Sequence, residues 1–304
     1  MKANRQAFGE ALVELYKSKP NIVSLDADLA AATYSAVFQK EHPESFIDCG
    51  IAEQNMMTVA AGLSTTGLIP FVSTFAVFAS LRAGEQFRNS ICYPHLNVKV
   101  VGTHAGIECG ADGATHQALE DIALMRTIPG TVVLAPADAY ATRALVFAMA
   151  DHEGPCYMRV GRDKVEEIYD ASAKFEIGGS HCLRKGDKAA ILAAGDRVQS
   201  ALEAASILEK EGIKVSVYDM YSIKPLDENA VKEAAECGLI VTVEDHQKVG
   251  GLGSAVCECV RRNKPCKVVT MGMESFGRSG PSSELFKFYG LDADAIVKTV
   301  KENI

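Results

Sequence analysis

Residues 98–116 read VKVVGTHAGIECGADGATH, and this stretch joins the two features that decide the fold and the site. It opens with a short apolar run, which is typical of a buried strand. A glycine-rich loop follows and carries His104, Glu108, Asp112 and His116. Glycine allows the backbone to approach a ligand closely. Taken alone, the loop is compatible with a small-molecule site, a structural loop, or a metal site held by His and Asp side chains.

Strand-like runs alternate with helical patterns on both sides of this stretch. Apolar runs predict further strands at residues 21–29, 45–50, 69–75, 131–138 and 155–161. Helical spacing of apolar residues fills the intervals, at residues 3–17, 53–66, 76–91 and 140–151. This alternation predicts crossover units in a largely parallel sheet.

The alternation lapses near residue 169 and then resumes, which indicates a second domain. The segment 169–185 has mixed charges, glycines and weak periodicity. Strand and helix patterns then alternate again to the C-terminus. The sequence therefore predicts an α/β fold with a first domain at 1–168, a linker at 169–185 and a second domain at 186–304. Each domain is expected to be a mainly parallel sheet flanked by helices.

Composition excludes several classes of protein. The chain has 304 residues and a net charge of −8, which argues against binding a row of nucleic-acid phosphates. No apolar run approaches the roughly 20 residues of a membrane helix, and the N-terminus does not resemble a signal peptide. The nine cysteines have no disulfide or zinc spacing, so we expect buried thiols in a cytoplasmic protein and no metal site on this chain.

Several residues outside the loop are candidates for chemistry, although each has a simpler explanation. Glu53 opens a helix directly after a strand, where the helix dipole favours an acid in any case. Phe75 and Phe78 share a helix face and are either core residues or a platform for a flat heterocycle. Arginine side chains suit phosphate groups, and three separated ones matter only if the fold brings them together. They are Arg5, Arg159 and Arg162.

In combination, these motifs resemble the pyrimidine-binding and C-terminal domains of transketolase. The first domain contributes the motifs DCGIAEQNM, IPFVSTFAVF, HAGIECGADGATHQALEDIALMR and GRD, and the second contributes VEDHQKVGGLGSAV and ESFGRSGPSSELFKFYGL. The resemblance covers essentially the whole chain.

The resemblance implies thiamine diphosphate as the cofactor and assigns residues to it. Glu53 matches the glutamate that bonds to N1′ of the aminopyrimidine ring and acts catalytically. Phe75 matches the residue stacked on that ring, with Phe78 beside it. Asp28 matches an acid near the cofactor across a subunit interface. A third aromatic that often follows in the family is Leu81 here, which leaves the pocket wall looser.

The resemblance also implies which residues hold a sugar phosphate. Asp112 and His116 match residues that face the sugar, and His116 is the second catalytic candidate. His104 matches a histidine near the sugar phosphate. Arg5 and Arg162 match phosphate-binding arginines. A serine expected in the same region is replaced by Ala32, next to Thr33, which puts one phosphate contact in doubt.

One missing motif predicts a partner chain. Thiamine enzymes hold the diphosphate and Mg²⁺ through Gly-Asp-Gly, which occurs nowhere in this sequence. We therefore expect the chain to be the C-terminal half of a split transketolase. A separate chain would carry the diphosphate-binding domain and the Mg²⁺ ligands. The expected assembly is an α2β2 heterotetramer with contacts between copies of this chain. It would transfer a two-carbon ketol unit from a ketose phosphate to an aldose phosphate in the pentose phosphate pathway.

Two alternatives remain open from sequence. The first is a related enzyme, either a 1-deoxyxylulose-5-phosphate synthase or the β subunit of a 2-oxoacid dehydrogenase. The synthase typically has Arg-Ala-Gly where this chain has His104-Ala105-Gly106. The second alternative is a non-catalytic scaffold subunit that has kept the fold.

Overall fold

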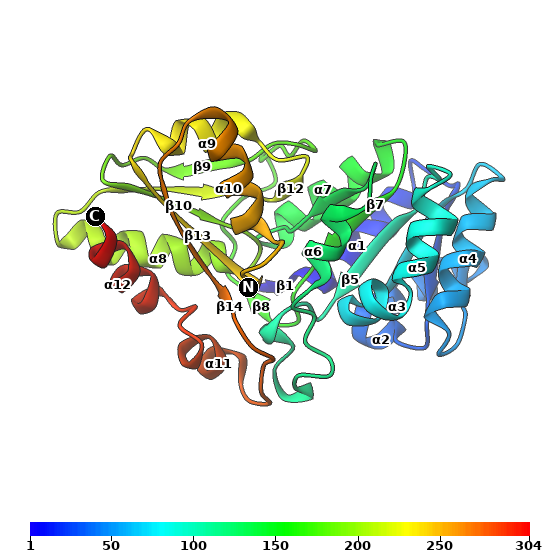
Figure 1. The fold of residues 1–304 in the computed structure, drawn as a ribbon. Helices are drawn as coiled ribbons and strands as arrows, with labels where there is room; N and C mark the ends of the chain where they lie inside the picture. Colours follow the sequence, from blue (N-terminus) through cyan, green and yellow to red (C-terminus); the bar gives the residue numbers. More distant parts are fainter.

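The glycine-rich stretch leaves the middle of a seven-stranded sheet in the computed structural model, which describes residues 1–304 (Figure 1). The strand order is β12-β6-β7-β5-β4-β2-β3, and all neighbours except β12 and β6 run parallel. The parallel strands are β2 (Ile22–Asp26), β3 (Phe46–Asp48), β4 (Ile69–Phe75), β5 (Lys99–Thr103), β6 (Val132–Leu134) and β7 (Cys156–Arg159). The predicted α/β fold with mainly parallel sheets is confirmed.

Helices cover both faces of this sheet. Successive residues of a strand point to opposite faces, so each strand contributes side chains to the helix layers on both sides. Phe71 and Val101 pack in one core cluster with residues of α1 (Asn4–Tyr16) and α7 (Ala139–Asp151). Their neighbours Val72 and Val100 pack in another cluster with residues of α4 (Glu53–Ser64). This double coverage explains why the strands read as continuous apolar runs. Outside the segment that follows β4, the remaining α-helices of this half are α2 (Ala30–Thr33), α3 (Ser35–Glu41) and α6 (Asp121–Thr127).

The helical segment after β4 is irregular. Two stretches of π-helix, Phe78–Arg82 and Phe87–Cys92, flank the short α5 (Gly84–Gln86). A π-turn shifts the side chains that follow it relative to a regular α-helix, and such turns occur frequently at functional sites. The sequence predicts a helix here but gives no sign of the altered winding.

The second half contains a five-stranded sheet in the order β14-β13-β10-β11-β9. Its strands are β9 (His181–Arg184), β10 (Ala189–Ala193), β11 (Val215–Asp219), β13 (Leu239–Gln247) and β14 (Lys267–Met273). Only β9 runs antiparallel to its neighbour. Core residues of α8 (Arg197–Lys210) and α12 (Ala293–Asn303) cover one face, and those of α9 (Glu228–Ala235) and α10 (Leu252–Asn263) cover the other.

The two halves are interlocked, which the sequence did not predict. Strand β12 (Ser222–Lys224) belongs to the second half of the chain but pairs antiparallel with β6 of the first sheet. Strand β9 lies inside the segment 169–185, so the expected linker contributes a strand to the second sheet. The N-terminal β1 (Lys2–Ala3) also pairs with β8 (Lys164–Val165). A single apolar cluster contains both Val133 and Ile223, so the halves share a core.

Two further sequence expectations concern the cysteines and the membrane. Cys92, Cys109, Cys156 and Cys259 are buried free thiols, but the expectation of burial is wrong for Cys182 and Cys257, which are exposed. None of the helices has both the length and the apolar character required to cross a bilayer.

Candidate active site

Glu53 is a buried carboxylate with a single cationic partner. It is the first residue of α4, directly after the turn that follows β3, and its side chain is only 2% exposed. Both carboxylate oxygens accept from Nη1 of Arg82, at 3.0 and 3.1 Å. Arg82 ends the first π-helical stretch and is itself half-exposed. Sequence reasoning missed Arg82, because the π-turn determines where its side chain points.

Arg82 also lies on the aromatic pair. Its guanidinium carbon is 4.6 Å from the ring centroid of Phe78. The rings of Phe75 and Phe78 are nearly parallel, at 6° and 5.7 Å between centroids. Phe75 is buried and Phe78 is partly buried. The two rings therefore form a platform beside Glu53, which is the geometry that the functional interpretation requires.

The histidines of the glycine-rich loop (residues 104–116) meet this platform. The His104 ring stacks on Phe75 with 3.9 Å between centroids. The His116 ring presents an edge to Phe75 and Phe78, at 6.2 and 5.6 Å. His104 has a φ of 56°, in the left-handed region that non-glycine residues rarely adopt. Such conformations cluster at functional sites, where the surrounding structure compensates for the strain.

Two positively charged side chains, Arg5 and Arg162, lie near His104. Nε of Arg5 donates to the carbonyl of Arg162 at 2.9 Å. Nη1 of Arg162 donates to the carbonyl of Cys109 at 2.7 Å and lies 3.7 Å from the Asp112 carboxylate. Burial, together with the nearby Arg5 and Arg162, lowers the pKa of His104 to about 3. His104 is therefore neutral at physiological pH and can donate or accept a hydrogen bond.

Around Ala32, where the resemblance predicts a phosphate-binding serine, the polar groups are engaged in hydrogen bonds within the chain. Nη1 of Arg5 donates to the Ala32 carbonyl at 2.6 Å. The neighbouring Thr33 is fully buried, and its hydroxyl donates to the Asp26 carboxylate at 2.7 Å. Thr33 thus does not replace the serine. Arg5 and Arg162 remain as the groups available to a phosphate.

Three residues considered from sequence lie outside this group. Asp28 is exposed at the end of β2, and its backbone N–H donates to Asp48, but its side chain forms no hydrogen bond. Leu81 is 53% exposed and adds no ring to the platform. Arg159 is buried and bonded to Asp121 at 2.9 Å, so it is excluded as a phosphate ligand.

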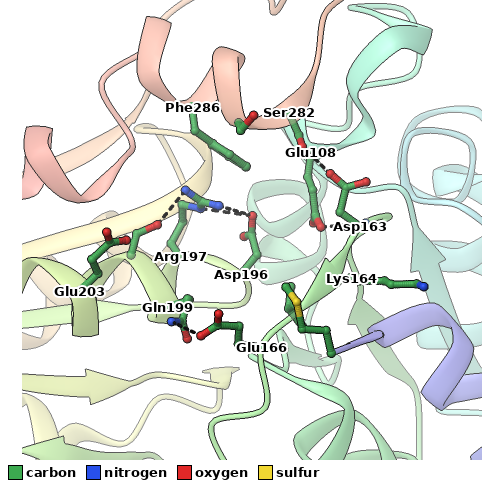
Figure 2. A pocket seen from close by; sticks show the side chains of 14 residues that line it. Glu108, Asp163, Lys164, Glu166, Asp196, Arg197, Gln199, Glu203, Ser282 and Phe286 are labelled. Atoms are coloured by element: carbon green, nitrogen blue, oxygen red, sulfur yellow. Dashed lines mark hydrogen bonds and ion pairs between the residues drawn. The ribbon is translucent and has the colours of Figure 1, made fainter.

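A polar hollow of about 310 Å³ lies elsewhere, at the boundary between the two halves (Figure 2). Glu108 and Asp163 line it from the first half, and Asp196 and Arg197 from the second. Arg197 is already bonded to Asp196 and stacked on Phe286. The hollow contains none of the residues gathered around Glu53 and Phe78.

The comparisons with known proteins agree with the fold. Residues 1–167 match the transketolase pyrimidine-binding domain, and residues 178–296 match the transketolase C-terminal domain. The chain therefore belongs to the transketolase family.

Within that family, the chain is similar to proteins of its own length. It is 48% identical to a putative transketolase C-terminal section from Methanocaldococcus jannaschii, over 100% of this chain and 96% of the relative. It is 40% identical to one of the subunits of an apulose-4-phosphate transketolase from Phocaeicola vulgatus, over 99% and 97% of the two chains. A solved split-gene transketolase, described as an inactive β4 tetramer, matches with a TM-score of 0.94 and 49% identity, over 99% of this chain and 98% of that one.

Other relatives are about twice as long. The chain covers between 48% and 51% of several mammalian transketolases and transketolase-like proteins.

Proposed function

We propose that this chain supplies the pyrimidine side of a thiamine diphosphate site in a two-chain transketolase. The observation that carries the proposal is the position of the buried Glu53 carboxylate beside the stacked Phe75 and Phe78 rings. Membership of the family implies thiamine diphosphate as the cofactor.

The residues present fit the aminopyrimidine ring. That ring is flat and carries a nitrogen that can share a proton with a carboxylate. Glu53 offers two acceptor oxygens, and Phe78 offers an aromatic face next to them. A guanidinium, which is also flat and rich in N–H donors, already makes both contacts in this structure. Glu53 would hold the proton that it shares with the ring nitrogen, while the thiazolium part of the bound cofactor supplies the acidic carbon that carries the two-carbon unit.

The loop side of the platform suits a polar, phosphorylated sugar. Neutral His104 and the His116 ring lie against Phe75, and Asp112 lies next to Arg162. Asp112 and His116 would bind sugar hydroxyls, and His116 would exchange protons with a reacting oxygen. Arg5 and Arg162 would hold the phosphate through charge-assisted hydrogen bonds.

We propose that a second chain completes the site. It would carry the Gly-Asp-Gly motif, the Mg²⁺ ligands and the diphosphate contacts, in an α2β2 heterotetramer in which copies of this chain touch. Asp28, exposed on the surface, would then approach the cofactor of a neighbouring subunit. Full-length matches to a transketolase C-terminal section and to one subunit of a multi-subunit transketolase support this division of labour.

A reconstitution assay tests the proposal. This chain is purified alone and mixed with the chain that carries the Gly-Asp-Gly domain, in thiamine diphosphate and Mg²⁺. We expect ketol transfer from xylulose 5-phosphate to ribose 5-phosphate only in the mixture. Calorimetry on this chain alone should detect little thiamine diphosphate binding at micromolar concentration. Transfer by this chain alone, or a folded complex without transfer from any of a panel of ketose phosphates, would refute the proposal.

A further inference from the structure

The glycine-rich loop contains little regular secondary structure. Residues His104, Gly106, Gly110 and Gly113 all have positive φ values. Its only regular part is the 3-10 segment Ile107–Asp112, which is broken at Gly110. Such a segment gains few internal hydrogen bonds, so neighbouring parts of the chain must fix its conformation.

One of these neighbours is Asp245 at the end of β13, in the C-terminal domain. Its side chain is buried, and each carboxylate oxygen accepts one backbone N–H of the loop. Oδ1 accepts from Ile107 at 2.9 Å, and Oδ2 accepts from Glu108 at 3.1 Å. The packing is close, since a Cβ added to Gly106 would overlap with Oδ2.

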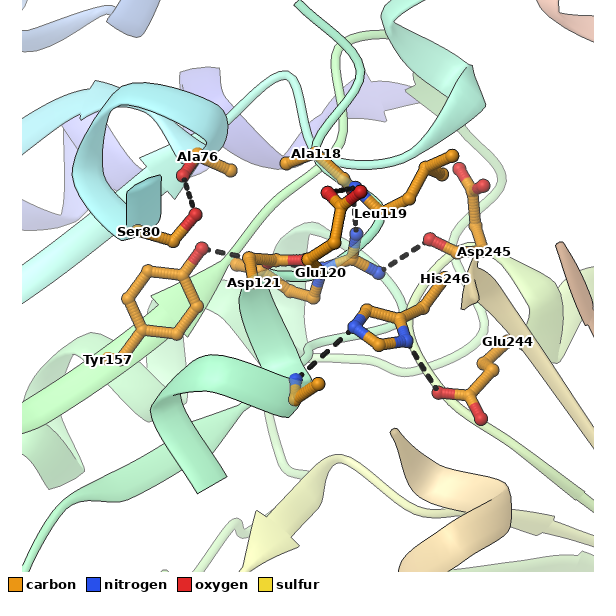
Figure 3. A network of polar contacts seen from close by, with 12 residues as sticks. Ala76, Ser80, Ala118, Leu119, Glu120, Asp121, Tyr157, Glu244, Asp245 and His246 are labelled. Atoms are coloured by element: carbon orange, nitrogen blue, oxygen red, sulfur yellow. Dashed lines mark hydrogen bonds and ion pairs between the residues drawn. The ribbon is translucent and has the colours of Figure 1, made fainter. Parts of the chain in front are cut away.

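Asp245 lies in a polar network with Asp121 and Tyr157 (Figure 3), and Arg159 bonds to its backbone carbonyl. Its Nη1 donates to the Asp245 carbonyl at 2.9 Å, and its Nη2 donates to the Ala118 carbonyl at 3.2 Å. Its Nε bonds to Asp121 at 2.9 Å, and Asp121 also accepts from Tyr157 at 2.8 Å. Through Arg159, strand β13 is thereby tied to the residues that follow the loop.

The C-terminal end of the loop packs against a second segment of the C-terminal domain. Nε2 of Gln117 donates to the carbonyl of Arg278 at 2.9 Å. A Cβ on Gly113 would overlap with Oγ of Ser279, and one on Gly277 would overlap with Oε1 of Gln117. Figure 1 shows α11 (Ser282–Phe288), which continues this segment, next to the loop that follows β5.

We propose that the C-terminal domain sets the conformation of the substrate-facing loop, with Asp245 as the principal positioning residue. Asp112 and His116 lie between the Asp245 contact and the Gln117 contact. A shift at either end would move both side chains relative to Phe75 and Phe78. The inference rests on the proposed function for its link to substrate, but its structural part can be tested separately.

Asp245→Asn is the decisive variant, because it preserves shape and removes one acceptor. An amide offers one oxygen, so an NH2 group would face the second loop N–H. The second loop N–H would then lack its acceptor, which weakens the attachment of the loop to β13. We expect the KM for the sugar phosphate to rise about tenfold or more in the reconstituted complex, and kcat to fall as well because the loop also carries His116. Amide hydrogen exchange in residues 106–118 of this chain alone should accelerate at least about tenfold.

Asp227→Asn is the matched control. The Asp227 carboxylate also accepts two backbone N–H groups, from Asn229 and Ala230, but it caps α9 away from the loop. This variant should lose stability without changing the KM or the exchange of residues 106–118. If Asp245→Asn does not fold, Gln117→Met removes the contact to Arg278 and should increase the same exchange and the KM.

The outcomes separate the two proposals. Wild-type exchange and an unchanged KM in a folded Asp245→Asn, or in Gln117→Met, would overturn the positioning role. Faster exchange in a complex that shows no ketol transfer at all would keep the structural role and refute the proposed function.

Discussion

Nη1 of Arg82 lies 3.0 and 3.1 Å from the two carboxylate oxygens of Glu53, while the same guanidinium covers the ring of Phe78. These are the two contacts that an aminopyrimidine ring would make. The arginine is half-exposed and lies at the end of a π-helical stretch, so it has solvent to move into. If Glu53 binds the cofactor ring as proposed, Arg82 must first leave Glu53.

Replacing Arg82 should strengthen cofactor binding. In Arg82→Gln the aminopyrimidine ring of the cofactor no longer competes with a guanidinium for Glu53 and Phe78. A partly exposed ion pair contributes about 0.2–1 kcal/mol, so the Kd for thiamine diphosphate should fall by about 1.4- to fivefold. Calorimetry on the reconstituted complex measures this change. Arg88→Gln is the control, because Arg88 is an exposed residue of the same helical segment. Weaker binding by Arg82→Gln would show that the arginine supports the cofactor.

Replacing Glu53 should abolish most of the activity. Glu53→Gln keeps the size of the side chain but cannot exchange a proton with the ring nitrogen. Loss of a general acid–base group typically costs about 10²- to 10⁴-fold in rate. Initial rates of the reconstituted complex measure the effect, and Glu14→Gln, in an exposed ion pair with Arg143, is the control. A fully active Glu53→Gln complex would instead favour the scaffold interpretation.

His104 should remain neutral across the physiological pH range. Burial first, and then Arg5 and Arg162, lower its pKa to about 3. Its NMR signals should therefore stay constant between pH 8 and pH 5, whereas an ordinary histidine titrates near 6.5. Removing a positive charge in Arg5→Gln should raise the pKa of His104 by up to about one unit. A His104 titration near pH 6.5 in the wild-type chain would contradict this prediction.

Asp219 should make the chain less stable as the pH rises. Burial raises its pKa to about 8, while Tyr169 donates a 2.7 Å hydrogen bond to one oxygen. The folded state therefore binds an extra proton between the unfolded pKa near 4 and pH 8. Stability falls across that window.

Asp219→Asn removes this pH dependence. Thermal unfolding of both proteins at pH 5 and pH 9 should show the variant gaining about 4 kcal/mol relative to wild type at the higher pH, since the window covers about three pH units at about 1.4 kcal/mol each. Comparing the two pH values cancels any constant effect of the amide. An equal difference between the proteins at pH 5 and pH 9 would contradict the raised pKa.

Periodicity predicted most of the fold, because buried parallel strands and amphipathic helices leave strong local patterns. Those patterns placed β2, β4 and β5 correctly. They did not reveal that β12 joins the first sheet, because strand pairing across distant parts of the chain has no local pattern. Strand β9 was also missed, since its four residues alternate weakly inside a polar segment.

The candidate site was predicted unevenly for the same reason. Glu53, Phe75 and the loop histidines stand at strand ends, where ligands gather in open α/β sheets, and the structure brings them together. Arg82 depends on a π-turn that residue spacing does not reveal. Asp245 lies 138 residues from Ile107, so its contact with the loop depends on how the two domains are docked.

Strand β12 comes from the second half of the chain but pairs in the first sheet, which limits where the chain can be divided into fragments that fold. A fragment that ends before residue 222 would lack the strand that covers β6. It would present an open sheet edge, which is a template for aggregation. The remaining fragment would carry a detached strand without a sheet to join. Limited proteolysis within 169–185 should therefore leave two pieces that stay associated, and attempts to express either half alone should yield insoluble protein.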